Sequence, residues 1–200
     1  MSSNPTPDSI APWRPAIAKA LHLGRRSPQS RYFQLATTGV DGRPSNRTVV
    51  FRGYLEPSNT IQIITDTRSE KIRDLQTHPW GEICWYFAET REQFRLSGRI
   101  EVVTGESAEL SLQKARYVMW KNISGPARAQ FAWPFPGKPR KEDKELFSAS
   151  ELDAERPLDN FALLLFVSDR VDHLQLRGEP QNRRRYWLEA GVWHEEEVNP

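Results

Sequence analysis

Apolar and polar residues alternate along much of this chain with the period of two that is typical of β-strands. Residues 60–65, for example, are rich in β-branched side chains, which strands favour. Residues 161–167 are almost entirely apolar, which predicts a central strand covered on both faces. In all, the pattern predicts strands at 32–38, 44–55, 60–65, 81–88, 93–103, 161–167, 171–176, 183–188 and 192–198.

Three other segments space their apolar residues three and four positions apart, which predicts helices at 13–23, 69–77 and 106–120. In the second helix, Thr67 or Ser69 can act as the N-cap, and Pro79 ends the helix. Residues 123–145 show neither period, so we expect an irregular stretch there. Its aromatic residues favour a functional loop over a disordered one.

Strands in hairpin order, with only a few helices, predict a mainly β fold: an antiparallel barrel with helices at its ends. Glycine-containing turns at 39–42 and 189–191 support the hairpin order. Two hundred residues are enough for one domain with a sizeable core. We expect that domain to span residues 13–200, after a polar, proline-rich segment at 1–12 that we expect to be flexible.

The composition narrows the setting in which the chain works. Its formal net charge of +2 does not indicate binding to nucleic acid or to a membrane. Cys84 is the only cysteine, which excludes an internal disulfide and any multi-cysteine metal site, and favours a reducing compartment. The first residues lack the features of a secretion signal, and no run is apolar enough to span a bilayer. We therefore expect a cytoplasmic protein.

Histidine and tryptophan usage bears on possible ligands. The four histidines are scattered without metal-ligand spacing, so no metal site is predicted. Seven tryptophans are many for this length, and we expect them in a core and a dimer interface. The alternative is that one or two of them border a flat aromatic ligand.

The predicted strand that follows Gly42 carries the first candidate chemistry. Period-two alternation places Arg47, Val49 and Phe51 on one face and Thr48, Val50 and Arg52 on the other. The two arginines then face opposite ways and would serve different groups of a ligand. The alternative is that both are solvated arginines at the edge of a sheet.

The second candidate is the start of the helix predicted at 69–77. Thr65 and Ser69 offer hydroxyls, Lys71 adds a mobile charge, and the helix start offers backbone N–H groups and the positive end of a dipole. Anions bind readily at such a position. Together with Arg47, this arrangement suits a phosphorylated cofactor. The alternative is an ordinary capped helix with a surface lysine.

Two further segments are weaker candidates for binding a ligand. Gln93 begins a strand, and its amide can both donate and accept, which suits the edge of a flavin or a pyrimidine; alternatively it faces solvent. Residues 183–185 are three consecutive arginines, which can be interpreted as a nucleic-acid patch. Because the overall charge is near neutral, we expect one arginine to point inward and the others to be solvated.

With these segments in view, the chain resembles the FMN-binding split-barrel superfamily. Within it, the resemblance is to the pyridoxamine 5′-phosphate oxidase-like proteins, in the branch typified by cyanobacterial members. It runs from about Ala36 to the C-terminus. The segments that carry it are 47–52, 64–65 with 69–71, 92–98, 130–137, Trp193 and 198–200.

The resemblance implies FMN as the cofactor, bound at the two-fold interface of an obligate homodimer. The residues it implies for the FMN phosphate are Arg47, Lys71, Thr65 and Ser69. The residues whose backbone it places beside the isoalloxazine ring are Thr48, Val49, Val50 and Phe51. It also implies that Gln93, from the partner subunit, and Arg183 contact the flavin. No nucleic-acid or membrane partner is implied.

The chain also departs from the family pattern. A Ser-Arg-Lys phosphate motif is here Ser69-Glu70-Lys71, so an acid replaces one cation. The Arg-Leu-His signature that holds the pyridoxal substrate of the true oxidases is replaced by Glu179-Pro180-Gln181. Leu174 stands where a tryptophan is expected near the flavin. The resemblance therefore implies FMN binding, but not the oxidation of pyridoxamine 5′-phosphate in particular.

From this we expect an FMN-dependent oxidoreductase that acts on an unidentified small substrate. Arg52 is our candidate for an anionic group of that substrate, and Trp133 lies in the loop expected to wall it in. One alternative is a non-catalytic FMN carrier or sensor. A lesser alternative is a barrel that binds haem or another cofactor, with His173 or His194 as the only histidines to consider for it.

Overall fold

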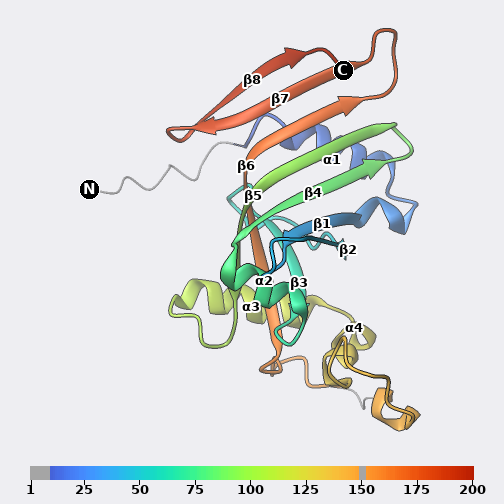
Figure 1. Cartoon of the computed structure of the whole chain (residues 1–200), viewed down its shortest axis with the longest axis vertical. Helices are drawn as coiled ribbons and strands as arrows, with labels where there is room; N and C mark the ends of the chain where they lie inside the picture. Colours follow the sequence, from blue (N-terminus) through green and yellow to red (C-terminus); the bar gives the residue numbers. More distant parts are fainter. Residues whose placement is uncertain (1–9, 149–151) are drawn as a thin grey trace.

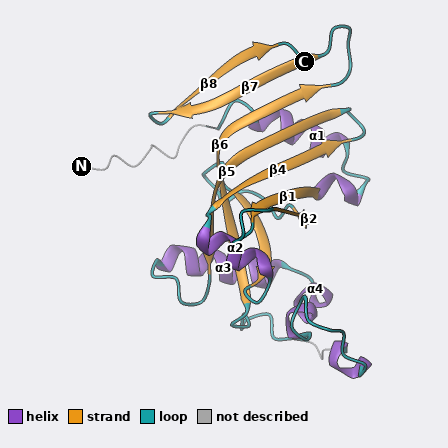
Figure 2. Ribbon diagram, in the orientation of Figure 1, coloured by secondary structure: helices purple, strands orange, loops and turns teal. Residues whose placement is uncertain are grey.

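A computed structural model describes residues 10–148 and 152–200 and places an antiparallel sheet at the centre of the molecule (Figures 1 and 2). The helices are α1 (Arg14–Leu23), α2 (Glu70–Thr77), α3 (Leu110–Asn122) and α4 (Gly125–Ala129). Short 3-10 turns lie at Pro28–Arg31, Gln130–Ala132 and Lys144–Phe147. The strands are β1 (Tyr32–Thr38), β2 (Pro44–Val50), β3 (Ile61–Asp66), β4 (Trp80–Phe87), β5 (Glu92–Val103), β6 (Phe161–Gln175), β7 (Asn182–Glu189) and β8 (Val192–Val198).

The sheet order is β2-β1-β4-β5-β6-β7-β8, and β3 joins the sheet through β6; the strands of each neighbouring pair are antiparallel. The first half of β6 lies between β3 and β5, and its second half lies between β7 and β5. The sheet is therefore split between β2 and β3. Two backbone hydrogen bonds cross that split, from Arg52 N to Gln62 O at 3.0 Å and from Gln62 N to Gly53 O at 2.9 Å. The predicted mainly β, antiparallel architecture with flanking helices is confirmed.

A bulge explains one wrong prediction. We expected separate strands at 161–167 and 171–176, but β6 is continuous from Phe161 to Gln175. Its register against β5 shifts between Ser97 and Gly98, where the polar residues 168–170 interrupt the apolar run. At Gly98 a Cβ would lie 2.1 Å from the carbonyl oxygen of Val167, so only glycine allows the two strands to approach so closely.

Three other boundaries differ from prediction. The strand predicted at 44–55 ends at Val50, because the chain turns away to form an isolated bridge between Tyr54 and Ile61. The helix predicted from 106 begins at Leu110, after a turn in which Thr104 N donates to Ser107 Oγ. The stretch predicted to be irregular contains α4, capped by the hydroxyl of Ser124.

The apolar residues form two cores. In the larger one, α1 covers one face of the sheet, and its Trp13 and Ile17 pack with sheet residues such as Trp85, all of them fully buried. In the smaller one, Trp120 of α3 contacts the ring of Phe161 at 5.0 Å. Trp80 is 55% exposed and Trp133 is 36% exposed, so the tryptophans are not all core residues. Within the described residues, every helix is too short or too polar to serve as a membrane span.

Candidate cofactor site

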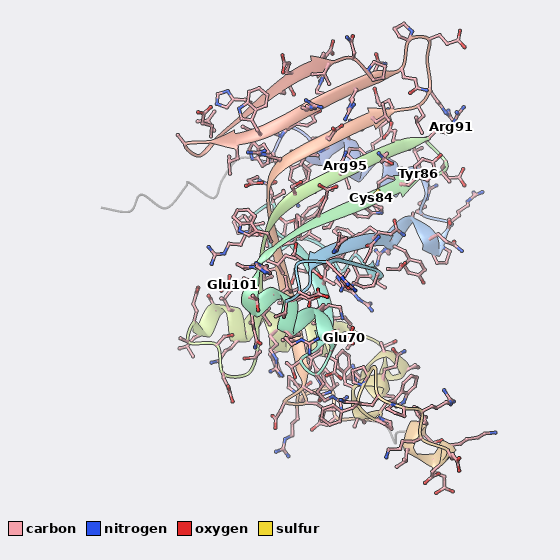
Figure 3. The ribbon with its side chains drawn as sticks, in the orientation of Figure 1. Glu70, Cys84, Tyr86, Arg91, Arg95 and Glu101 are labelled. Atoms are coloured by element: carbon pink, nitrogen blue, oxygen red, sulfur yellow. The ribbon has the colours of Figure 1, made fainter. Side chains whose placement is uncertain are left out.

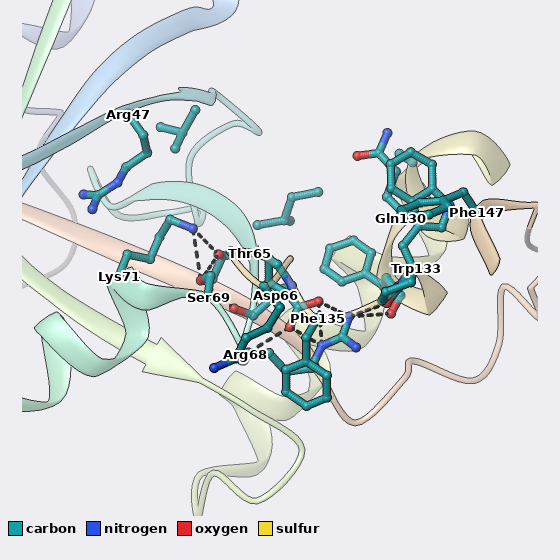
Figure 4. Close-up of a pocket in the computed structure, with 18 of the residues that line it drawn as sticks. Arg47, Thr65, Asp66, Arg68, Ser69, Lys71, Gln130, Trp133, Phe135 and Phe147 are labelled. Carbon is teal, nitrogen blue, oxygen red and sulfur yellow. Dashed lines mark hydrogen bonds and ion pairs between the residues drawn. The ribbon is translucent and has the colours of Figure 1, made fainter. Parts of the chain in front are cut away.

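A cavity of about 680 Å³, here called the β2–β3 cavity, opens between β2, the turn from β3 into α2, and the segment 130–147 (Figure 4). That volume lies within the range of about 300–1,000 Å³ typical of ligand sites. Its lining includes most of the residues predicted from the sequence: Arg47, Thr48, Val49, Val50, Arg52, Thr65, Ser69, Lys71 and Trp133. Phe51 lies behind this wall in the core, 4.9 Å from the ring of Trp85.

Thr65, Ser69 and Lys71 meet in one triangle, drawn in Figure 4. The ammonium of Lys71 donates to Thr65 Oγ1 at 2.9 Å and to Ser69 Oγ at 3.1 Å, and the two hydroxyl oxygens lie 3.2 Å apart. The turn is fixed locally, because Ser69 donates from its backbone N and from its hydroxyl to the carbonyl oxygen of Asp66, at 3.0 and 2.7 Å. The three polar groups are thus held together at the end of β3.

The triangle lies at the start of α2. Ser69 is the N-cap residue, but its hydroxyl does not cap the helix N–H groups, so it remains directed at Thr65 and Lys71. Burial lowers the pKa of Lys71, and the nearby charge of Arg47 lowers it further. A helix N-terminus and a desolvated cation together favour an anion at this point.

Arg47 is held on the same side by four groups. It donates to Thr37 Oγ1 and Ser45 Oγ, both at 2.7 Å, and to Leu35 O at 3.2 Å, and it lies 3.6 Å from the carboxylate of Asp74. Burial lowers the pKa of Arg47 even though Asp74 opposes that shift. The guanidinium is therefore positioned beside α2 before any ligand is present.

Sequence reasoning missed Asp74. This carboxylate is buried, and it accepts a hydrogen bond from Thr37 Oγ1 at 2.9 Å. The signal was available, because residues three apart share a helix face and Lys71 and Asp74 have that spacing. On α2, Lys71 and Asp74 lie on the face that is turned toward Arg47 of β2. That face therefore forms a charged site and not an apolar contact.

Arg52 corrects a prediction about orientation. We expected Arg47 and Arg52 to face opposite ways, yet both line the β2–β3 cavity. The alternation does not reach Arg52, because β2 ends at Val50. Within the described chain, the buried Nε of Arg52 has no hydrogen-bond partner. Burial lowers the pKa of Arg52 and the charge of Arg31 lowers it further, so an anion here would be stabilised.

Arg68, which was not among the residues predicted for the site, holds the far wall of the cavity in place. It donates to both carboxylate oxygens of Asp66 at 2.6–3.1 Å and to the carbonyl oxygens of Phe131 and Trp133, each at 3.1 Å. Asn160 also donates to Asp66 and to Phe131 O, both at 2.8 Å. Burial raises the pKa of Asp66, but these hydrogen bonds outweigh it and the pKa is lowered.

This arrangement bears on Glu70, the acid that replaces a cation of the family motif. Glu70 is exposed and lies outside the cavity lining. Arg68 is already paired with Asp66, and Arg73 is exposed on α2, so neither cation is placed beside Lys71. The phosphate-sized group of donors is therefore built from Arg47, Lys71 and hydroxyls.

Gln93 and Arg183 lie elsewhere in the sheet. They flank Leu174 across β5, β6 and β7, and Tyr86 of β4 pairs with Gln93 in the same row. Figure 3 labels Tyr86 and Arg95 on this part of the sheet, well away from Glu70 of α2. Arg183 donates to the carboxylate of Asp172 at 2.7–3.3 Å. The structure does not bring these two residues to the β2–β3 cavity of their own chain.

The remaining arginines of the run 183–185 and the segment 179–181 also lie elsewhere in the structure. Arg184 pairs with Glu197, and Arg185 lies 3.7 Å from Asp172, so both arginines have acidic neighbours. Pro180 and Gln181 line a second cavity of about 970 Å³ near the C-terminus, apart from the first.

The two histidines considered for haem stack on aromatic rings. His173 lies 4.0 Å from Phe94 and His194 lies 5.5 Å from Trp187, measured between ring centroids. Among the described residues, no group of three or more potential metal ligands was found.

The edge position of β2 adds a further property. In the described sheet β2 pairs only with β1, so one row of its backbone N–H and C=O groups can meet a ligand instead of a strand. Thr48, Val49 and Val50 of this strand line the cavity. A flat heteroaromatic ring placed along this edge would have its polar rim matched by backbone groups, with its phosphate near Lys71.

Comparisons of sequence and structure relate this chain to known proteins. Residues 10–104 match the family model described as pyridoxamine 5′-phosphate oxidase, FMN-binding domain. Over 197 residues, the chain is 38% identical to pyridoxine/pyridoxamine 5′-phosphate oxidase 2 of Arabidopsis thaliana, covering 96% of this chain and 98% of that protein. A pyridoxine/pyridoxamine 5′-phosphate oxidase of Burkholderia multivorans is 36% identical over 87 residues, which is 44% of this chain and 40% of that protein.

Two solved structures are similar in fold. A pyridoxamine 5′-phosphate oxidase-related, FMN-binding protein of Nostoc punctiforme has a TM-score of 0.94 at 51% identity, covering 96% of this chain and all 100% of that one. PhzG of Burkholderia lata, in complex with tetrahydrophenazine-1-carboxylic acid, has a TM-score of 0.78 at 18% identity, covering 98% of this chain and 100% of that one. At that identity, the second likeness speaks to the fold alone.

Proposed function

Because the chain belongs to the pyridoxamine 5′-phosphate oxidase family, whose shared domain binds FMN, we propose that the β2–β3 cavity is its FMN site. The observation that carries this proposal is the convergence of Lys71, Thr65 and Ser69 with Arg47 at the start of α2. A phosphate dianion there would receive charge-assisted hydrogen bonds from both cations. Thr48, Val49 and Val50 would then run beside the isoalloxazine ring.

We further propose that the protein is an FMN-dependent oxidoreductase acting on a small planar substrate. When bound, FMN supplies two-electron hydride chemistry at its ring, so the protein need only bind and orient the reactants. The buried Nε of Arg52 has no hydrogen-bond partner in residues 10–148 and 152–200, so Arg52 could hold an anionic group of the substrate. Trp133 lies across the cavity on the Arg68-anchored wall and would limit access of water to the ring.

We propose that the working unit is a homodimer that completes the site. In support, Gln93 and Arg183 are family flavin contacts by resemblance, yet they lie away from the cavity of their own chain. They share a sheet face with Tyr86, which is 46% exposed. A second copy that covered this face would bury Tyr86 and bring the pair to the first copy's flavin.

The cofactor proposal is tested by titrating the purified protein with FMN and with riboflavin, which has the same ring but no phosphate. Loss of flavin fluorescence reports binding of each. We expect FMN to bind at least about 100-fold more tightly, since two charge-assisted contacts of about 1.5–3 kcal/mol each depend on the phosphate. Equal affinity for the two flavins would contradict the assignment of Arg47 and Lys71.

Mixed dimers test whether two chains share one site. The Lys71→Gln variant should lose the phosphate contact, and the Arg183→Gln variant should lose the contact from the other chain. In a 1:1 mixture whose chains exchange freely, about half of the dimers contain one chain of each variant, and one of the two sites in such a dimer has both native residues. Tight FMN binding should therefore return at about a quarter of all sites. Failure to restore binding, when each variant still forms dimers, would show that Arg183 serves its own chain.

Catalysis is tested separately from binding. The FMN-loaded protein is mixed anaerobically with pyridoxine 5′-phosphate or pyridoxamine 5′-phosphate, and bleaching of the flavin absorbance is followed. Bleaching faster than with free FMN supports an oxidoreductase. No bleaching with either compound, followed by reoxidation of chemically reduced protein no faster than free reduced FMN, would favour the carrier or sensor alternative.

A further inference from the structure

One end of the β2–β3 cavity, here called the phosphate end, brings two cations together. Figure 4 shows Arg47 and Lys71 at this end of the cavity. The two side chains come from different elements, β2 and α2, and burial lowers the pKa of each. For Lys71, the charge of Arg47 is the next largest cause of the lowering. Two partly desolvated like charges are unfavourable in the protein unless an anion lies close to them.

Asp74 supplies a carboxylate at this place. It is 4% exposed, and its Oδ2 lies 3.6 Å from Arg47 Nη2. The hydroxyl of Thr37 links the two residues, because it accepts from Arg47 Nη1 at 2.7 Å and donates to the same Oδ2 at 2.9 Å. A hydroxyl has one proton to donate, so these hydrogen bonds run in one direction, from the guanidinium to the carboxylate. The charge of Asp74 also opposes the lowering of the pKa of Arg47 and Lys71 by burial.

The other carboxylates near the two cations are less effective counter-ions. Asp66 also opposes the lowering of the pKa of Lys71 by burial, but both of its oxygens accept from Arg68, at 2.6–3.1 Å. Glu70 is exposed, so solvent screens its charge. Of the acidic residues that the structure describes, Asp74 alone is buried. The two cations therefore depend mainly on Asp74 for a nearby negative charge.

Asp74 lies behind the cations and not among the groups that a ligand meets. Arg47 and Lys71 line the cavity, whereas Asp74 does not. Arg47 also donates to three acceptors other than the carboxylate: Leu35 O, Thr37 Oγ1 and Ser45 Oγ. A neutral oxygen at position 74 could still accept from Thr37, so the hydrogen bonds that hold Arg47 do not require the charge. The charge itself acts on the two cations and on any phosphate that approaches them.

We infer that Asp74 is the built-in counter-ion of the phosphate end: it stabilises the paired cations when no cofactor is bound, and it weakens the binding of a phosphate that pairs with the same two cations. The inference rests on the proposed function, because it takes the FMN phosphate as that anion. A carboxylate and a phosphate on either side of Arg47 repel each other. FMN is then an exchangeable cofactor of this chain, bound less tightly than Arg47 and Lys71 alone would allow.

The test replaces Asp74 by asparagine, which keeps the size of the side chain and an oxygen that can accept from Thr37 but removes the charge. The matched control is Glu70→Gln, which removes one acidic charge from an exposed position of the same helix. Fluorescence titrations give the dissociation constants of FMN and riboflavin for each protein. Thermal unfolding of the flavin-free proteins is measured with and without inorganic phosphate, and potassium chloride keeps the ionic strength equal.

We expect Asp74→Asn to tighten FMN binding at least about fivefold and to change riboflavin binding by less than about twofold. Without flavin, the unfolding midpoint of this variant should fall by at least about 2 °C, because two buried cations lose their partner. Inorganic phosphate should raise that midpoint more than it raises the native one. The control should change FMN binding by less than about twofold. Adding Lys71→Gln to Asp74→Asn removes one charge of each sign, so the double variant should be more stable than Asp74→Asn.

The inference is overturned if Asp74→Asn binds FMN as the native protein does or more weakly, because the carboxylate would then serve only to hold Arg47. It is also overturned if the flavin-free variant is as stable as the native protein, if the double variant is no more stable than Asp74→Asn, or if variant and control behave alike. A native protein that does not prefer FMN to riboflavin would instead reject the proposed function. The midpoints of the flavin-free proteins then still decide whether Asp74 balances the two cations.

Discussion

The two ends of the β2–β3 cavity are built in different ways. At the inner end, Arg47 and Lys71 come from a strand and a helix, and side-chain hydrogen bonds within the chain fix both of them. At the outer end, Lys138, Arg140 and Lys141 lie on a loop and are exposed, and Arg140 lies over the ring of Phe147. A cofactor phosphate is the same whatever the substrate, so it can be bound by residues of helices and strands. A loop, by contrast, can change its residues without disturbing the sheet. We therefore expect the phosphate of the cofactor at the inner end.

The largest expected effect removes a charge from the inner end. Lys71→Gln should raise the FMN dissociation constant about 10- to 150-fold, because a charge-assisted hydrogen bond contributes about 1.5–3 kcal/mol. Binding of riboflavin should change little, since it has no phosphate. Fluorescence titration measures both, with Lys114→Gln on α3 as the control for loss of a lysine. A comparable loss of riboflavin binding would mean that Lys71 supports the ring or the fold.

A second variant loosens the outer end and leaves the inner end intact. Arg68→Ala removes the hydrogen bonds to Asp66, Phe131 O and Trp133 O. We expect trypsin to cleave after Arg140 or Lys141 about tenfold faster, because cleavage tracks local opening of the segment. The control is Arg73→Ala, on the exposed side of α2. Unchanged cleavage would show that Arg68 does not restrain the loop.

The smallest expected effect is a pH dependence confined to the inner end. In the ligand-free protein, burial and then Arg47 lower the pKa of Lys71, and a bound phosphate would raise that pKa again. FMN binding then takes up a proton at alkaline pH, so its affinity should fall severalfold as the pH rises through the lowered pKa. Titrations from neutral to alkaline pH measure this, and riboflavin controls for ionisation of the ring.

Lys71→Arg distinguishes that mechanism from general alkaline loss of structure. An arginine stays charged throughout the range, so the alkaline fall in FMN affinity should flatten even if affinity at neutral pH is lower. A fall identical to that of the native protein would place the titrating group elsewhere.

Sequence patterns predicted the strands well because most are half-buried and alternate cleanly, as β1 and β3 do. They failed where tertiary contacts override the local pattern. Ser168, Asp169 and Arg170 resemble a strand end, yet a bulge opposite Gly98 carries β6 through them. No period-two argument places Arg52 correctly, because β2 stops two residues before it.

The same limit applies to the site. Arg47, Thr65, Ser69 and Lys71 were predicted because strand end and helix start are local signals. Arg68 and Asn160 could not be, since their shared partners Asp66 and Phe131 lie far apart in the sequence and meet only through packing. The segment 137–141 was expected only as part of an irregular stretch, because its position beside the cavity depends on the hydrogen bonds from Arg68 to Phe131 O and Trp133 O.

The pairing of β3 with β6 also sets an order of events during synthesis. Thr65 and Asp66 pair with Ala162 and Phe161, and Asn160 reaches Asp66 across 94 residues of chain. A ribosome that has released only residues 10–104, the span of the family model, has exposed Arg47 and Lys71 but not β6, the strand with which β3 pairs. Contacts so distant in sequence form late. We therefore expect FMN to bind only when the chain is nearly complete. The cofactor would then stabilise a fold that has already formed and would not nucleate folding.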